Sequence, residues 1–294
     1  MSKWIKDVEE LASIAGDNPQ AALCALNAAV CKRWKYTQRI MGDISELFLP
    51  LEEVISTKFV RAVCGRRLSD VERKIISLPY RYGGLSIDNP VASSDVEYTC
   101  SKIISSKLVE CIQSQNLDSI PSEQEKKRAK QEAKVVREAS VKLLYDTICG
   151  EVSDEMKKLM SSAQEKGASS WLSCLPVDKL GFSLNKQEFQ DALSLRYNWP
   201  INGMPKHCAC GEVNNIDHTL ICKKGGYVAM RHNQLRDTEA FLMKEVARDV
   251  TIEPVLLPVN NAVFQQGIHQ IMPDWTYPQG AYGVVQRRHS LMFE

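Results

Sequence analysis

Hydrophobic residues in the first part of the chain recur with the period of an α-helix. From Pro19 to Trp34 the apolar positions follow one another at intervals of three or four residues, which predicts a helix with one buried face. A second run of the same kind extends from Leu47 to Val63 and is expected to end near Gly65. This part of the chain is therefore predicted to be mainly α-helical.

Local start signals divide the following sequence into further helices. Asn89-Pro90 combines a capping residue with a proline, which suits the first helical turn. Three capping boxes, in which Ser or Asn is followed three residues later by Glu, occur at Ser69–Glu72, Ser122–Glu125 and Asn185–Glu188. The second box is expected to open a long charged helix that reaches about Gly150, with an extension to Lys166 left open.

The pattern changes after Gly167, where segments shorten and prolines recur. One more helix is predicted over Arg231–Asp249, and the tail is expected to hold a short strand, for example Thr251–Leu257, or to be disordered. The expected fold class is mainly α, with a small irregular domain and little β structure. The expected domains are a helical region, a long charged helix or linker, a small metal-binding domain, and a helix with a tail, at residues 1–118, 119–168, 169–230 and 231–294.

Charge and cysteine usage narrow the class of protein. The 37 Lys and Arg residues nearly balance the 36 Asp and Glu residues, for a net charge of +1. This balance excludes a uniformly basic protein, although it allows a local basic face. No apolar stretch is long enough for a signal peptide or a membrane span, so we expect an intracellular protein, nuclear or cytoplasmic, with reduced thiols. Seven of the ten cysteines lie singly and are expected in the core.

The other three cysteines belong to the most specific motif of the sequence. Cys208 and Cys210 are followed by His218 and, four residues later, by Cys222. Three thiolates and one imidazole are a standard ligand set for structural zinc, and residues four apart share one face of a helical turn. We therefore expect these four residues to bind one structural zinc ion, with His207 as an alternative ligand. The competing interpretation is three unrelated thiols and a surface histidine.

Two basic runs are candidate contacts for phosphate groups. The first also contains aromatic residues, which suits phosphate contact combined with base stacking. In the second, lysines at intervals of four share one stripe of a helix. Together with two arginines at the start of the predicted last helix, the candidate residues are Lys32, Arg33, Trp34, Tyr36, Arg39, Lys126, Lys127, Lys130, Lys134, Arg231 and Arg236. The local pattern alone favours a solvated helix face with two core aromatics.

Several phrases occur in an order that resembles a known family. They are RWKYTQRI (Arg33–Ile40), LPLEEVI (Leu49–Ile55), SDVERKIISLPYRYGGLSIDNP (Ser69–Pro90), SSWLSCLP (Ser169–Pro176), FQDALSLRYNW (Phe189–Trp199), the cysteine motif and RHNQLRD (Arg231–Asp237). Their order resembles the region downstream of the polymerase palm in reverse-transcriptase-like proteins of eukaryotic retrotransposons, over about Pro19 to Pro258. The resemblance implies thumb-like or connection helices from Pro19 to Gln115, and it implies that the cysteine motif is the zinc-binding segment that follows the polymerase.

The catalytic motifs of such proteins are incomplete in this chain. There is no Asp-Asp dipeptide for a polymerase site. Some members of the family end in a restriction-like nuclease, whose helical acid would be Asp237 or Glu239 and whose next acid would be Asp274, but no Lys follows Lys244. The leading hypothesis is a non-catalytic reverse-transcriptase fragment that binds RNA or DNA without sequence preference. Alternatives are a zinc-stabilised helical protein-interaction module and a nuclease that uses Asp237, Glu253 and Asp274.

Overall fold

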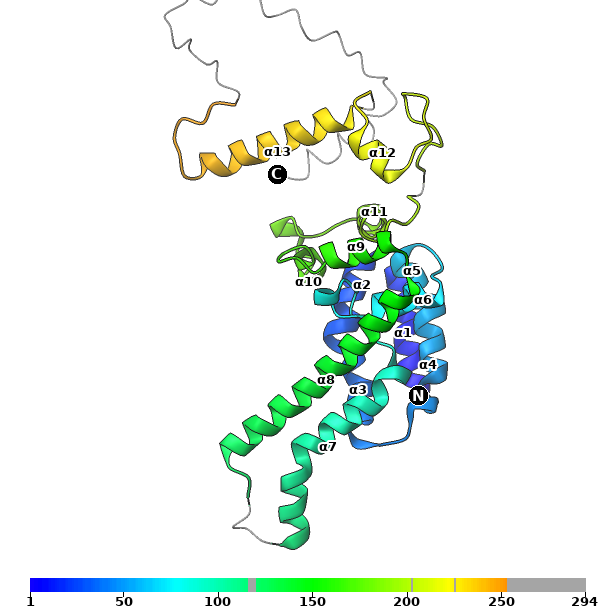
Figure 1. Cartoon of the computed structure of the whole chain (residues 1–294), viewed down its shortest axis with the longest axis vertical. Coiled ribbons are helices and arrows are strands. Elements are labelled where there is room, and N and C mark those ends of the chain that lie inside the picture. Colours follow the sequence, from blue (N-terminus) through cyan, green and yellow to red (C-terminus); the bar gives the residue numbers. More distant parts are fainter. Residues whose placement is uncertain (116–119, 202, 225, 253–294) are drawn as a thin grey trace, which may run out of the picture. The chain divides into compact units, whose positions relative to one another are not determined.

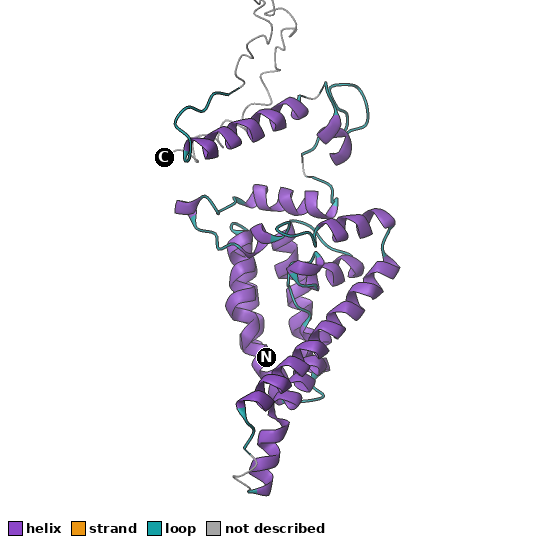
Figure 2. Cartoon of the chain, turned by 60° about the vertical axis from the view of Figure 1, so that its left-hand side comes forward, coloured by secondary structure: helices purple, strands orange, loops and turns teal. Residues whose placement is uncertain are grey.

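The structure, a computed structural model, describes residues 1–115, 120–201, 203–224 and 226–252. The chain divides into two compact units, Met1–Asn202 and Gly203–Glu294 (Figure 1). Within the described ranges all regular elements are helical, and the one β-type contact is an isolated antiparallel bridge between His207 and Val213 (Figure 2). The predicted fold class, mainly α with a small irregular region, is confirmed.

The first unit begins with helices that form one continuous core. Their bounds are α1 Ser2–Ala15, α2 Pro19–Ala25, α3 Cys31–Ile40, α4 Leu49–Val54 and α5 Val60–Cys64. A π-helical turn over residues 26–30 joins α2 to α3, and another over residues 55–59 joins α4 to α5. α5 ends where predicted, because Gly65 takes the left-handed conformation that favours glycine, with φ of 70°.

The remaining helices of this unit begin at the capping signals. Their bounds are α6 Asp70–Ser77, α7 Pro90–Ser114, α8 Glu123–Glu151, α9 Asp154–Ser162, α10 Ser170–Ser173 and α11 Lys186–Tyr197. Short 3₁₀ segments cover residues 45–48, 80–82 and 178–180. All three predicted capping boxes are present, with reciprocal side-chain and backbone hydrogen bonds. The extension of the long helix to Lys166 is wrong, because Ser153 caps a separate helix, α9.

Large apolar side chains fill the space between these helices. Trp34, Phe48, Phe59 and Phe189 are among the fully buried ones. α11 packs on α2, α5 and α9, and the Tyr197 hydroxyl donates a 2.9 Å hydrogen bond to the carbonyl of Gly83. Residues 169–201 therefore belong to the first unit, so its boundary differs from the predicted boundaries at 168 and 230.

α7 and α8 form an antiparallel hairpin. They run side by side, and the ends nearest to residues 115–122 project beyond the other helices of the first unit (Figures 1 and 2). Small residues allow close contact between the two helices, since the thiol of Cys100 lies 3.3 Å from the carbonyl oxygen of Ala133 and both residues are fully buried. Toward the projecting end the hairpin buries little besides Cys111.

The second unit contains α12 (Ile216–Ile221) and α13 (Tyr227–Lys244). α13 begins four residues before the predicted helix start and ends five residues before Asp249, and its one buried residue is Ala240. Of the proposed strand Thr251–Leu257, the first two residues are described and are not in a strand, whereas the rest of it and the tail after residue 252 lie outside the described residues. No helix in the described parts of the chain is both long and apolar enough to span a membrane.

Candidate metal centre

A tight turn positions the first two cysteines. The backbone N–H of Asn214 donates to the carbonyl of Lys206 at 2.9 Å, and that of Cys208 donates to the carbonyl of Glu212 at the same distance. These two hydrogen bonds hold residues 206–214 in a turn. Gly211 lies in this turn with φ of 96°, a left-handed conformation that a side chain would disfavour. The turn therefore presents the thiols of Cys208 and Cys210 on one side.

A short helix positions the other two ligands. The Asn215 side chain accepts a 2.7 Å hydrogen bond from the backbone N–H of His218, which caps α12. The backbone N–H of Cys222 donates to the carbonyl of His218 at 2.8 Å, so the two residues are one turn apart. Their side chains consequently point to the same side, as the interval of four residues predicted.

The four side chains converge on one point. The Sγ atoms of Cys208 and Cys222 are 3.6 Å apart, the Cys210 Sγ is 3.1 Å from the His218 Nε2, and all four ligand atoms lie within 4.8 Å of one another. A Zn–S bond of about 2.3 Å places two sulfurs of a tetrahedron about 3.8 Å apart. The separation is too long for a disulfide, whose sulfurs lie about 2.05 Å apart. This cluster can hold a metal ion, whereas His207 is exposed and lies outside it.

The electrostatics of the cluster also suit a cation. A backbone hydrogen bond from Glu212 would lower the pKa of the Cys210 thiol, but desolvation and the adjacent thiols of Cys222 and Cys208 outweigh it, so that the pKa is raised. Crowded thiols resist ionising together because their negative charges repel. A bound cation removes that repulsion and releases the thiol protons.

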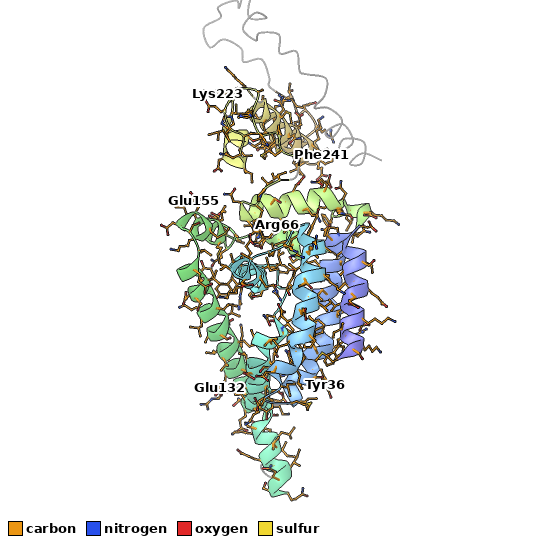
Figure 3. All side chains as sticks on the ribbon, turned by 90° about the vertical axis from the view of Figure 1, so that its right-hand side faces the viewer. Tyr36, Arg66, Glu132, Glu155, Lys223 and Phe241 are labelled. Carbon is orange, nitrogen blue, oxygen red and sulfur yellow. The ribbon has the colours of Figure 1, made fainter. Side chains whose placement is uncertain are left out.

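The first basic run lies on α3 and is mostly paired. Arg33 forms an ion pair with Asp7, and Arg39 forms one with Glu97. Lys32 is exposed, and Tyr36 lies at the surface with 68% of its area exposed (Figure 3). Trp34 is only 1% exposed. The prediction that Trp34 contacts a base is therefore wrong for this structure, because its indole is part of the core and cannot stack on a ligand.

The second basic run lies on α8 and remains largely accessible. Lys126 is paired with Glu123 at 2.7 Å. Lys127, Lys130 and Lys134 are exposed, and no ion pair involves them within the described ranges. These lysines therefore present positive charge to solvent.

One acid joins the two basic runs. The same Glu97 oxygen accepts from Arg39 Nε at 3.0 Å and from Arg137 Nη2 at 3.1 Å. Burial would raise the pKa of Glu97, but the hydrogen bond from Arg39 and the charges of Arg137 and Lys35 outweigh it and hold the pKa below its ordinary value. The two arginines thus bring one excess positive charge to this point. Sequence reasoning missed Glu97, because nothing local marks an acid whose partners are 58 and 40 residues away.

The candidates in the second unit are separate from the metal cluster's ligands. Arg231 is exposed on α13, and Arg236 is paired with the adjacent Asp237 at 2.8 Å. Asp237 and Glu239 are exposed on the same helix. Glu253 and Asp274 lie outside the described residues, so the structure gives the proposed nuclease acids no common geometry.

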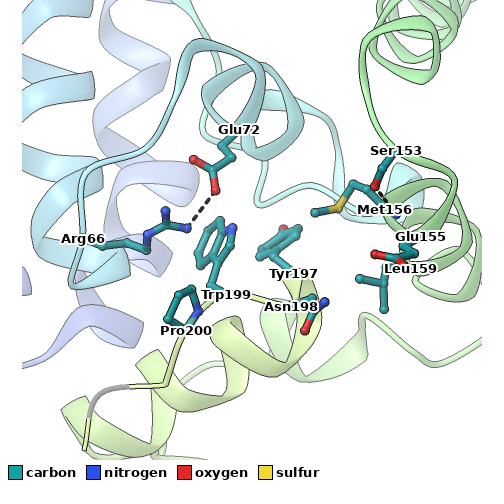
Figure 4. A pocket seen from close by; sticks show the side chains of 10 residues that line it. All are labelled: Arg66, Glu72, Ser153, Glu155, Met156, Leu159, Tyr197, Asn198, Trp199 and Pro200. Carbon is teal, nitrogen blue, oxygen red and sulfur yellow. Dashed lines mark hydrogen bonds and ion pairs between the residues drawn. The ribbon is translucent and has the colours of Figure 1, made fainter. Parts of the chain in front are cut away.

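A cavity that the sequence did not indicate lies in the first unit (Figure 4). It has a volume of about 240 Å³ and lies beside Trp199. The guanidinium carbon of Arg66 lies 5.0 Å from the centroid of the Trp199 ring, and the ring centroids of Tyr197 and Trp199 are 4.7 Å apart. Arg66 is paired with Glu72 at 2.8 Å. Trp199 is only 4% exposed, so the cavity offers no free aromatic face for stacking.

Comparison with known proteins found no matching family model, no similar curated protein and no similar solved structure.

Proposed function

We propose that this chain is a zinc-stabilised nucleic-acid-binding protein that has no catalytic role and descends from the reverse-transcriptase-like proteins that its sequence resembles. The support for nucleic-acid binding is electrostatic. Glu97 brings Arg39 of α3 and Arg137 of α8 together, and the accessible lysines of α8 continue from Arg137 along the hairpin. A polyanion lying on this surface gains affinity by releasing counterions from its phosphates.

The test of binding is its dependence on salt. The wild-type chain is expected to bind RNA or DNA with an affinity that falls linearly with salt on logarithmic axes. Changing Lys126, Lys130 and Lys134 to Gln should lower that slope by about 2–3, because three phosphate contacts are lost. The control variant loses the same charge elsewhere in the first unit, by changing to Gln the exposed lysines Lys158, Lys166 and Lys186. No binding at low salt, or equal losses in both triple variants, would overturn the proposal.

Zinc is the metal that the cluster's donor set favours. Three soft thiolates and an imidazole suit zinc better than the oxygen-preferring cations Mg²⁺ and Ca²⁺. Four convergent protein side chains are enough to fill a tetrahedral coordination shell, which is the pattern of a structural site. Its role is to tie the turn at residues 206–214 to α12. Cobalt substitution tests the geometry: a tetrahedral Co²⁺ spectrum with thiolate charge-transfer bands is expected, and an octahedral spectrum would contradict it.

A protein-interaction module is the alternative that one observation favours. α13 and the turn that follows it expose apolar side chains at Leu235, Leu242, Met243 and Val246, the last with 83% of its area exposed. Contiguous exposed apolar surface often marks an interface with another protein. A pull-down that recovers the same partner after complete nuclease treatment would favour this function over nucleic-acid binding.

A further inference from the structure

The hairpin of α7 and α8 carries two parallel columns of different chemistry. On α7, Ile104, Leu108 and Ile112 follow one another at intervals of four residues and expose 41%, 49% and 61% of their areas. On α8, Lys126, Lys130 and Lys134 have the same spacing and are all exposed. Residues four apart on a helix lie one above the other, so each set forms a column along its helix.

The ion pair between Glu97 and Arg137 places both columns on one face of the hairpin. Ile104 and Leu108 follow Glu97 by seven and eleven residues, which are two and three helical turns. Lys134 and Lys130 precede Arg137 by three and seven residues, so they lie on the side of α8 that carries Arg137. Since Glu97 meets Arg137 across the hairpin, the apolar column and the lysine column face the same way.

A second ion pair marks the opposite face. Lys107 of α7 pairs with Glu125 of α8. Neither residue shares a stripe with the two columns: Lys107 lies about 60° or more around α7 from Ile104 and Leu108, and Glu125 lies about 100° or more around α8 from Lys126 and Lys130. The acids on the face with the columns are Glu97, Glu123 and Glu138, and each is already paired with a cation, Glu138 with Arg81. This face, which we call the hairpin face, therefore joins uncompensated positive charge to exposed aliphatic surface.

We propose that the hairpin face binds single-stranded nucleic acid in preference to duplex; this inference rests on the proposed function. Its lysines are about 6 Å apart along the helix, a spacing comparable with that of adjacent phosphates on an extended strand. A single strand can place its phosphates along the lysine column and turn its bases onto Ile104, Leu108 and Ile112, which buries apolar surface. A duplex keeps its bases stacked inside and presents phosphates to these side chains, so it gains only the electrostatic part.

The separation of the columns is compatible with one nucleotide. Axes of packed helices lie about 8–10 Å apart, which is comparable with the reach from a phosphate to the far edge of its base. The columns lack aromatic residues, so the contact with bases is aliphatic packing and is expected to discriminate little between base types.

The test compares a labelled oligo(dT) strand with a duplex of equal length at the same ionic strength, using fluorescence anisotropy and the full chain. Wild type is expected to bind the strand about tenfold or more tightly than the duplex. Changing Ile104, Leu108 and Ile112 to Gln should weaken strand binding about tenfold and leave duplex binding unchanged. All three residues are exposed, so circular dichroism and thermal unfolding of this variant should match wild type.

A matched control keeps the number and kind of changes but places them off the hairpin face. Ile14, Val135 and Leu143 expose 52%, 54% and 69% of their areas, and their changes to Gln should leave strand binding unchanged. If wild type binds neither strand nor duplex, the proposed function itself fails. If it binds duplex as tightly as strand, or if the two triple variants behave alike, this inference is overturned while the proposed function stands. The apolar column would then be left for a protein helix.

Discussion

Arg73 anchors the segment from which the hairpin starts. Its guanidinium donates to both carboxylate oxygens of Glu52 on α4, at 2.8 and 2.9 Å, and to the carbonyl of Ile87 at 2.8 Å. Arg73 is only 9% exposed. These bonds tie α6 and α4 to the turn that directly precedes α7. We predict that Arg73→Met destabilises the first unit more than any loss of a surface ion pair would.

The size of the destabilisation follows from the charge of Glu52, which loses its partner. Methionine fills much of the space of the arginine, so the main cost is the unpaired Glu52, whose side chain is only 15% exposed. Removing one partner of a buried ion pair costs about 3–5 kcal/mol. The loss of a donor to the carbonyl of Ile87 overlaps with this cost, since a buried acceptor without a partner costs about 1–3 kcal/mol. We expect a total of about 3–5 kcal/mol at neutral pH, a large share of the stability of a typical domain.

Urea denaturation of the single and double variants measures this cost. The double variant Glu52→Met, Arg73→Met lacks both charged partners, so no unpaired charge remains, and it should be more stable than Arg73→Met alone. Burial already raises the pKa of Glu52, with Arg73 opposing it, so losing Arg73 raises that pKa further. A carboxyl with a raised folded pKa is neutralised as the pH falls, so the deficit of Arg73→Met should shrink toward acid pH. A deficit below about 1 kcal/mol, or a double variant as unstable as the summed singles, would refute this reasoning.

Three further predictions concern the hairpin and the core. Asn89→Ala should cost about 1 kcal/mol in thermal or urea unfolding, because the Asn89 side chain caps α7 by accepting from two backbone N–H groups. The pKa of Glu97 is lowered in the folded state, so its contribution to stability is full above its unfolded pKa and is lost as the pH falls through its folded pKa. Glu97→Gln should therefore make the free energy of unfolding less dependent on pH in the acid range. An unchanged pH dependence there would contradict the pairing with Arg39 and Arg137. Burial raises the pKa of Cys64 to about 12, so a thiol reagent should modify Cys64 only at the rate of unfolding, whereas modification as fast as that of a surface thiol would show that the core is open.

Helix starts and metal ligands could be predicted because their determinants are local. The boxes at Ser69 and Ser122 satisfy backbone groups within three residues, so the sequence window contains both partners. The ligands of the metal cluster lie within fifteen residues, and a turn and a helical turn are enough to bring them together. α1 also carries a local signal, since Val8, Leu11 and Ala15 recur at helical spacing and are buried.

Contacts between distant segments could not be predicted from local pattern. Trp34 lies between two basic residues, the exposed Arg33 and the half-buried Lys35, and only the packing of the surrounding helices decides that it is buried. The same holds for Glu97, whose partners come from two other helices. The hairpin face likewise depends on which sides of α7 and α8 meet, and this is a property of tertiary structure.

The metal content of the purified protein tests the central claim most directly. Elemental analysis of wild type, purified under reducing conditions without chelator, should find about one zinc per chain, and Cys208→Ser or Cys222→Ser should lose it. Cys174→Ser, a change to a cysteine outside the cluster, should keep the zinc. Wild type without zinc, or zinc retained after both Cys208→Ser and Cys222→Ser, would contradict the assignment of this cluster as a zinc site.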